Sequence, residues 1–315
     1  MEVIQGSRSL PIAGESSVTI GVFDGVHAGH RAVIGRAVGV ARERGLRAVA
    51  VTFDRHPLET LSPGKTPKLL TTPRRKAELI EALGVDALFV LEFTEAVSRW
   101  SPEEFIERVL IRGLHARHVA VGSSFTFGHR AAGTVATLTD LGGVHGYSAE
   151  GMETVLLASR RVSSSSIRDA LSAGDLEWPE LALGRRYAVE GTVVPGAGRG
   201  RELGFPTANL RTPEAICLPG RGVYAGRAIA GDASWAAAIN VGVNPTFGRE
   251  PLHLEAFLLG FDGDLTGTVL GIEFWARLRD EVAFDGPGEL SRQIGLDVEA
   301  TRRLVAGEER PPVIR

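Results

Sequence analysis

The run Val18–Phe23, followed by Asp24-Gly25-Val26-His27-Ala28-Gly29-His30, constrains the fold more than any other part of the chain. The first run is apolar and rich in residues that favour strands, which predicts a buried strand. The strand leads directly into a turn and then into a helix expected over residues 30–43. Gly25 and Gly29 lack a Cβ where a backbone would have to approach a ligand. Because a helix N-terminus favours anions, this order of elements predicts a loop that handles phosphate.

His27 and His30 are three residues apart, so both imidazoles are expected on one side of the helix. The spacing His-x-Gly-His is similar to the signature of a nucleotidyltransferase superfamily, in which imidazoles donate hydrogen bonds to phosphate oxygens during attack at the α-phosphorus. Two solvated histidines at a helix start are the alternative interpretation. The Gly-x-Phe-Asp-Gly segment before them favours the phosphate interpretation.

Length and composition predict two domains and no nucleic-acid partner. A chain of 315 residues is about twice a typical domain. Its net charge of -3 indicates no basic surface for nucleic acid. Cys217 is the single cysteine, which excludes an internal disulfide and fits a reducing compartment. No signal peptide is evident and no apolar run approaches about 18 residues, so we expect a cytoplasmic protein without a membrane partner.

The first half alternates strand-like and helix-like runs, which predicts a parallel sheet with crossover helices over residues 1–183. After the opening strand, the expected strands are 46–53, 87–93 and 118–121, and the expected helices are 73–83 and 102–112. Ligands bind at the carboxyl ends of the strands in such sheets. This principle places Phe23-Asp24, Phe53-Asp54 and 122–124 along one edge.

A polar cluster at residues 161–168 precedes a short helical stretch. Serines at a helix start can cap free backbone N–H groups, and Arg168, one turn into the helix, can pair with a phosphate. Capping alone is the alternative. Four consecutive serines exceed what a cap requires, so we expect a phosphate site if this helix end faces the two histidines.

After residue 183 the pattern changes to short β-like runs separated by glycines, which predicts a small antiparallel barrel over residues 184–315. The expected strands are 187–194, 222–229, 235–241, 253–259 and 269–278. The amphipathic stretch 287–304 is expected to be a packing helix.

The turn at residues 198–210 is the most glycine-rich of the barrel. Its glycines supply backbone donors, while Thr207 and Asn209, two residues apart, offer oxygen ligands to a magnesium ion. The segment lacks the Gly-Lys-Ser/Thr ending of a Walker loop. It can nevertheless bind a nucleotide.

Glu255 lies inside the apolar run 252–259, where an unpaired carboxylate would be costly. It could take a proton from a substrate hydroxyl as a general base, or it could lie on the solvated face of an edge strand. The polar Pro/Gly turn at residues 242–248, just upstream, favours the first interpretation.

Taken together, these segments resemble the bacterial bifunctional riboflavin kinase/FAD synthetase family almost from end to end. The matching motifs are Gly21–His30, Thr52–Pro57, Val121–Gly128, Val162–Arg168, Gly204–Leu210, Gly222–Tyr224 and Gly242–Gly248. The resemblance implies a Rossmann-like FMN adenylyltransferase domain followed by a six-stranded kinase barrel with a C-terminal helix. Together they would convert riboflavin and two ATP into FMN and then FAD, with Mg²⁺.

The resemblance also implies roles for individual residues. His27 and His30 would contact ATP phosphates, with Ser164, Ser165 and Arg168 binding the phosphates from the other side. In the barrel, Thr207 and Asn209 would bind magnesium and ATP, and Glu255 would activate the ribityl hydroxyl. Further nucleotide-binding positions implied by the motifs are Gly21, Phe23, Asp24, Gly25, Gly29, Gly204 and Pro206. Candidate flavin contacts are Ser124, Phe125, Phe127 and Tyr224, with core packing as the alternative for the aromatic residues.

Four positions depart from the family pattern. Ser124 replaces an Asn or Asp, Ser165 a Thr, Gly260 an acidic or amide residue, and Thr266 a Tyr. They motivate one alternative, a divergent paralogue that acts on a modified flavin or has one inactive domain. A flavin- or nucleotide-binding protein without catalysis is the other alternative. The sequence leaves the oligomeric state open.

Overall fold

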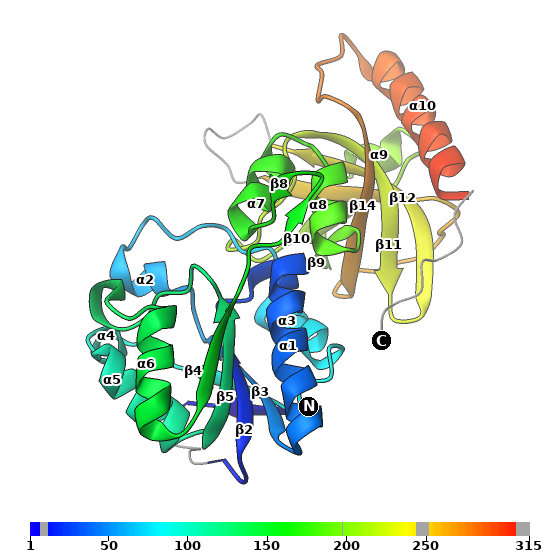
Figure 1. The fold of residues 1–315 in the computed structure, drawn as a ribbon. Helices are drawn as coiled ribbons and strands as arrows, with labels where there is room; N and C mark the ends of the chain where they lie inside the picture. Colours follow the sequence, from blue (N-terminus) through cyan, green and yellow to red (C-terminus); the bar gives the residue numbers. More distant parts are fainter. Residues whose placement is uncertain (7–11, 197, 244–251, 307–315) are drawn as a thin grey trace. The chain divides into compact units, whose positions relative to one another are not determined.

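The computed structural model describes all residues except 7–11, 197, 244–251 and 307–315 (Figure 1). By its internal contacts the chain divides into two compact units, of which the first is Met1–Ser164 and the second begins at Ser165. Each unit is described below by itself.

The first unit is built on a six-stranded parallel sheet, as the alternating pattern predicted. Its strands are β1 (Glu2–Gln5), β2 (Ser16–Ile20), β3 (Arg47–Phe53), β4 (Ala87–Leu91), β5 (Ala116–Gly122) and β6 (Ser148–Met152). Their order is β1-β4-β3-β2-β5-β6. The central neighbours β3, β2 and β5 are parallel, so their carboxyl ends meet at one edge of the sheet. This edge brings together the three segments expected there.

Helices cover both faces of this sheet, and each face has its own apolar core (Figure 1). On one face α1 (Ala28–Arg44) and α3 (Pro73–Glu81) pack over Ala50 and Leu88. On the other face lie α5 (Pro102–Phe105), which continues as a π-helical segment at Ile106–Ile111, and α6 (Val135–His145). Alternate strand residues therefore point to opposite cores, which explains the nearly continuous apolar runs.

Shorter elements complete the first unit. They are the 3-10 turns Asp24–Val26 and His129–Ala131, α2 (Pro57–Leu61), α4 (Glu95–Ser98), β7 (Leu156–Leu157) and β8 (Arg160–Arg161). The predicted strand 18–23 is longer than the observed β2, which ends at Ile20. It stops because the following backbone enters a turn in which Phe23 is left-handed, with a φ of 52°.

The second unit is a closed six-stranded barrel, as expected. Its strands are β9 (Tyr187–Val194), β10 (Ala208–Arg211), β11 (Gly222–Ala230), β12 (Ala233–Gly242), β13 (His253–Leu258) and β14 (Val269–Arg279), in the order β10-β13-β12-β11-β14-β9. The unit also contains α7 (Ser164–Ser172) from its second residue on, α8 (Glu177–Leu183), α9 (Arg199–Glu202) and α10 (Pro287–Ala306). Five of the six strands follow the sequence prediction, and the short β10 was missed.

An ion pair links helix α10 to the barrel. Arg279, at the end of β14, donates from Nη2 to Asp297 Oδ2 over 2.9 Å and from Nε to both carboxylate oxygens over 3.1 Å. Gln293 Nε2 donates to Asp297 Oδ1 over 3.0 Å. Asp297 is 5% exposed, so the guanidinium satisfies a carboxylate that would otherwise be buried without a cation.

Tyr224 is a core residue of the barrel. Its side chain is fully buried, its ring packs edge-on against Phe274, and its hydroxyl donates to the carbonyl oxygen of Gly220. Its burial favours the alternative of core packing, and its expected contact with flavin stays a prediction.

Candidate active sites

The turn after β2 is strained and tightly held. Phe23 has a φ of 52°, Gly25 of 81° and Val26 of 44°. A positive φ is accessible to glycine but costs energy at Phe23 and especially at the β-branched Val26. Such strain persists only where the surrounding structure fixes the backbone, and it is concentrated at functional sites.

Contacts from residues 70–71 fix this turn. Asp24 Oδ1 accepts hydrogen bonds from the backbone N–H groups of Leu70, over 2.8 Å, and Thr71, over 3.2 Å. Thr71 Oγ1 accepts from the N–H of Gly25 over 3.2 Å. Asp24 is 4% exposed. Asp24 thus fixes the turn, and its expected role in nucleotide binding stays a prediction.

The two histidines of the turn stack on each other. Their ring centroids are 3.6 Å apart with an interplanar angle of 17°, and the Phe23 ring lies edge-on to His30 at 5.3 Å. His27 is the N-cap of α1, and its Nδ1 accepts the backbone N–H of His30 over 3.3 Å. This bond places the proton of a neutral His27 ring on Nε2. Phe23 thus packs on His30, and its expected role in nucleotide binding stays a prediction.

His30 has an unusual environment. Burial lowers the pKa of its imidazole well below the ordinary value, and the charges of His27 and Lys76 lower it further. Its Nδ1 is buried and finds no hydrogen-bond partner among the described residues. A neutral imidazole with an unsatisfied nitrogen at a strained turn is what a ligand-binding site provides.

Gly21 and Gly29 leave room for the aromatic side chains of this segment, while their expected contacts with a nucleotide stay predictions. A Cβ on Gly21 would come within 2.7 Å of the Phe23 ring, and one on Gly29 within 3.2 Å of His27 Cε1. Larger residues at either position would therefore displace the aromatic cluster.

One serine of the polar cluster reaches this turn. Ser164 Oγ donates to the carbonyl oxygen of Asp24 over 3.0 Å. Ser164, the last residue of the first unit, therefore contacts the turn that carries the histidines. Ser165 and Arg168 follow on α7 and belong to the second unit, so their phosphate contacts stay predictions.

The candidate flavin contacts of the first unit differ in exposure. Ser124 is exposed, and its Oγ accepts from Arg161 Nη2 over 3.5 Å. Phe125 is half-buried and stacks on Phe127, with centroids 5.7 Å apart. Phe127 also packs against Phe105 in the core, so the structure assigns it to packing and leaves Ser124 and Phe125 as candidates.

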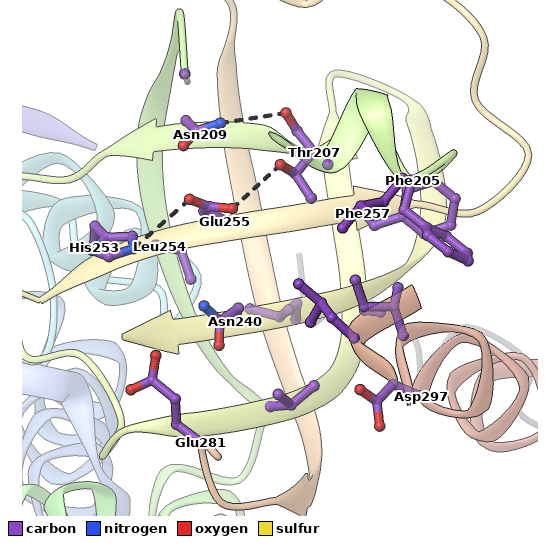
Figure 2. A pocket seen from close by; sticks show the side chains of 18 of the residues that line it. Phe205, Thr207, Asn209, Asn240, His253, Leu254, Glu255, Phe257, Glu281 and Asp297 are labelled. Carbon is purple, nitrogen blue, oxygen red and sulfur yellow. Dashed lines mark hydrogen bonds and ion pairs between the residues drawn. The ribbon is translucent and has the colours of Figure 1, made fainter. Parts of the chain in front are cut away.

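The barrel contains a cavity of about 600 Å³. Thr207, Asn209 and Glu255 all line it, as Figure 2 shows. Glu255 pairs in register with Asn209 on β10 and with Asn240 on β12. Side chains opposite each other on neighbouring strands point to the same face, so the carboxylate lies between two amides.

Glu255 is at the centre of a chain of polar contacts (Figure 2). Its Oε2 accepts from Thr207 Oγ1 over 3.3 Å, and its Oε1 lies 3.7 Å from His253 Nε2. Asn209 Nδ2 donates to the Thr207 carbonyl oxygen over 3.5 Å. The alternative of an edge strand is excluded, because β13 lies between β10 and β12 in a closed barrel. The turn at 242–248 that supported this expectation lies largely outside the described residues.

The donor set fits a magnesium ion. A hydroxyl, an amide oxygen and a carboxylate are hard oxygen ligands of the kind that Mg²⁺ accepts beside substrate phosphates. The backbone just after β9 approaches them closely, since a Cβ on Gly196 would lie 2.1 Å from Asn209 Nδ2. Only a residue without a side chain leaves this room.

Other expected barrel residues lie beside the cavity. Gly204 and Pro206 are exposed and do not line it, whereas Phe205 between them does. Their nucleotide contacts stay predictions. Gly260 and Thr266, two of the departures from the family pattern, also lie outside its lining.

Sequence reasoning missed several polar residues at both sites. In the cavity these are His253, Asn240 and Glu281. At the turn they are Thr71 and Lys76, whose ammonium contacts the backbone before Phe23. Strand register could have indicated Asn240, but the contacts of Thr71 and Lys76 join segments about 50 residues apart and have no local signal.

A Rossmann-like unit with stacked histidines at its strand edge, joined to a barrel with an acidic cavity, defines a two-site protein of the nucleotide-dependent transferase class. Comparison with known proteins agrees. The FAD synthetase family model matches residues 10–166, and the riboflavin kinase model matches residues 183–305.

Relatives and a solved structure match almost the whole chain. A bifunctional riboflavin kinase/FMN adenylyltransferase of Bacillus subtilis is 38% identical over 92% of both chains. One from Pseudomonas fluorescens is 36% identical, covering 97% of this chain and 98% of its own. A Streptococcus pneumoniae structure titled a macrolide-efflux protein superposes with a TM-score of 0.88 at 27% identity, over 96% of this chain and 99% of its own. The chain belongs to the bifunctional riboflavin kinase/FMN adenylyltransferase family.

The expected domain boundary at 183/184 stays a prediction. The compact units divide between Ser164 and Ser165, while the two family matches leave residues 167–182 unassigned. Within the part of the chain that the structure describes, no helix has the length and apolarity needed to cross a bilayer.

Proposed function

We propose that the second unit phosphorylates riboflavin to FMN and that the first unit adenylylates FMN to FAD, each with ATP. The observation that carries the proposal is that one chain contains both kinds of site. A carboxylate lies between oxygen and amide groups in the barrel cavity, and stacked imidazoles lie at a strained strand-to-helix turn. The substrates are small molecules, and we expect the protein to act in the cytoplasm.

In the kinase step Glu255 acts as the general base. It takes the proton of the ribityl 5'-hydroxyl while that oxygen forms a bond to the γ-phosphorus and ADP leaves. Thr207 keeps the carboxylate in position through its contact with Oε2, and His253 lies at the other oxygen. Thr207 and Asn209 would bind the Mg²⁺ that neutralises the transferred phosphoryl group.

In the adenylyl step an FMN phosphate oxygen attacks the α-phosphorus of ATP and pyrophosphate leaves, without a covalent enzyme intermediate. His27 donates from Nε2 to the phosphate oxygens, because its Nδ1 is engaged with the backbone of His30. Ser164, Ser165 and Arg168 bind phosphates from the start of α7. The reaction is accelerated by positioning and by donors fixed before the substrate arrives.

The flavin rings need apolar surfaces at both sites. In the barrel, Phe284, Leu290 and Ile294 line the cavity and offer such a surface for the isoalloxazine ring. In the first unit, Phe125 beside Ser124 takes this role. The aromatic ring of Phe125 is half-buried, so one face can stack on a flavin.

Incubation of the purified protein with riboflavin, ATP and Mg²⁺ tests the proposal. FMN should accumulate first and FAD should follow. Formation of FMN alone would favour the paralogue with an inactive first unit. Binding of ATP by calorimetry with no turnover of riboflavin or FMN would favour a binding protein.

A further inference from the structure

We propose that Lys76 is a positioning residue for adenylyl transfer, whose ammonium ion fixes the turn that carries His27 and His30. This inference rests on the proposed function of the first unit. It concerns a side chain that the chemistry above does not use.

Lys76 connects three segments of the first unit. Its Nζ, on α3, donates to the carbonyl oxygen of Val22 over 3.2 Å and to Thr52 Oγ1 over 3.0 Å. Thr52, at the end of β3, donates to the same carbonyl oxygen over 3.1 Å and is 1% exposed. The ammonium therefore links the carboxyl ends of the adjacent strands β2 and β3 to helix α3, which packs over the sheet.

The carbonyl that Lys76 binds directly precedes the strained backbone. Phe23 and Val26 have φ values of 52° and 44°. The contacts between Asp24 and residues 70–71 and between Thr71 and Gly25 fix the middle of this turn, and Lys76 fixes its start at Val22. Loss of the lysine would leave the Val22 carbonyl with the Thr52 hydroxyl alone, so the turn could relax and the histidines would shift.

The charge of Lys76 balances the acidic groups around it. The ionisable groups that face it are Asp24 in the turn, Asp54 after β3, and His30 on α1. Burial lowers the pKa of Lys76 to about 8, although Asp24 and Asp54 oppose this shift. When the ammonium loses its proton, Asp54 keeps its ion pair with Arg55, but the turn loses the positive charge that Lys76 provides beside Asp24, and anion binding weakens.

The dependence of both reactions on pH tests this role in the unmodified chain. Conversion of FMN to FAD and of riboflavin to FMN is followed at saturating ATP from about pH 6.5 to about pH 9.5. We expect the adenylyl rate at pH 9 to be about a tenth of its plateau, as titration of one group near 8 requires. The kinase rate, measured with the same ATP, should lack this decrease.

Two variants assign the decrease to Lys76. Lys76→Arg retains a cation that does not titrate in this range, so the decrease should move up by at least about one pH unit. Lys76→Met should lower the adenylyl kcat at neutral pH by roughly 30-fold and remove the decrease near 8. Arg74→Met removes a cation from the exposed side of the same helix and should leave the profile unchanged.

The outcomes separate this inference from the proposed function. A chain that makes no FAD at any pH contradicts the function of the first unit. A chain that makes FAD with no decrease above pH 8, or whose Lys76→Arg variant keeps the wild-type midpoint, contradicts the role of Lys76. If Lys76→Met does not fold, the wild-type and Lys76→Arg profiles still decide between these results.

Discussion

His27 and His30 stack with their ring centroids 3.6 Å apart, and the Nδ1 atom of the first accepts the backbone N–H of the second. The His27 imidazole is thus oriented by the first turn of α1, which contains His30. Because this contact fixes which nitrogen of His27 carries a proton, the site is prepared to donate hydrogen bonds before a nucleotide binds.

Replacement of His30 should separate the two activities. In His30→Ala we expect FAD formation from FMN to fall by at least about 100-fold, because the stacked pair and a phosphate donor are lost. FMN formation from riboflavin should stay within twofold of the wild type, roughly the error of such rates. His145→Asn, which changes a histidine on α6 of the same unit, is the matched control. Equal loss of both activities would contradict independent sites.

Replacement of Glu255 should have the opposite effect. Glu255→Gln keeps the shape of the side chain but removes the base, so kinase kcat should fall by about 10²–10⁴-fold with a smaller change in KM for riboflavin. Conversion of added FMN to FAD should persist. Glu289→Gln, an exposed carboxylate in the first turn of α10, serves as the control and should retain both rates. A Glu255→Gln variant with normal kinase activity would exclude the general-base role.

Elements with a local apolar pattern could be predicted from the sequence, whereas contacts between residues far apart in the chain could not. The apolar runs of β3, β9 and β13 predicted the sheet and the barrel because their side chains fill a core. By contrast, β10 is four residues long and carries Asn209 and Arg211, so no apolar pattern marks it. Its register with β13 is what places Asn209 beside Glu255.

The hydrogen bonds that Asp24 makes within the protein could not be predicted, for a similar reason. A carboxylate next to a glycine in a nucleotide motif suggested a ligand contact. Its partners within the protein, the N–H groups of Leu70 and Thr71, lie 46 and 47 residues further along the chain. Only the folded sheet brings these segments together, so no spacing rule could indicate them.

The energetic contributions of Arg279 and Asp297 to stability should be strongly coupled. Arg279→Met leaves the buried carboxylate of Asp297 without a cation, and we expect a loss of about 3–5 kcal/mol in the unfolding free energy of the second unit. Asp297→Leu combined with Arg279→Met should lose less than Arg279→Met alone. Chemical denaturation followed through the tryptophans of that unit provides the double-mutant cycle. Strictly additive losses would show that the pair is not coupled.

Lys76 should lower the unfolding free energy of the first unit at neutral pH, although it supports adenylyl transfer. Its pKa is lowered to about 8, so below that pH the folded state contains a buried charge that the unfolded state solvates freely. Between about pH 8 and the ordinary value of 10.5, the unfolded chain binds more protons than the folded one, and this penalty disappears as pH rises. Lys76→Met should therefore raise the unfolding free energy of the first unit at pH 7 by about 1–3 kcal/mol.

The advantage of Lys76→Met should shrink as pH approaches 10, because the wild-type lysine is then neutral in the folded state. Calorimetry at several pH values measures this difference, with the first unit's transition identified as the one that Arg279→Met, a change in the second unit, leaves unchanged. A variant that is less stable than the wild type at pH 7, with a difference independent of pH, would contradict the assignment of a buried charge.

Mixing the two variants, each of which should lack one of the two activities, tests the central claim of two separate sites most directly. His30→Ala and Glu255→Gln are each incubated with riboflavin, ATP and Mg²⁺, alone and together, and FAD is measured by chromatography. Neither variant alone should form FAD from riboflavin, while the mixture should, because FMN made by the first variant is adenylylated by the second. A mixture that forms FMN but no FAD, although Glu255→Gln converts added FMN, would contradict the account.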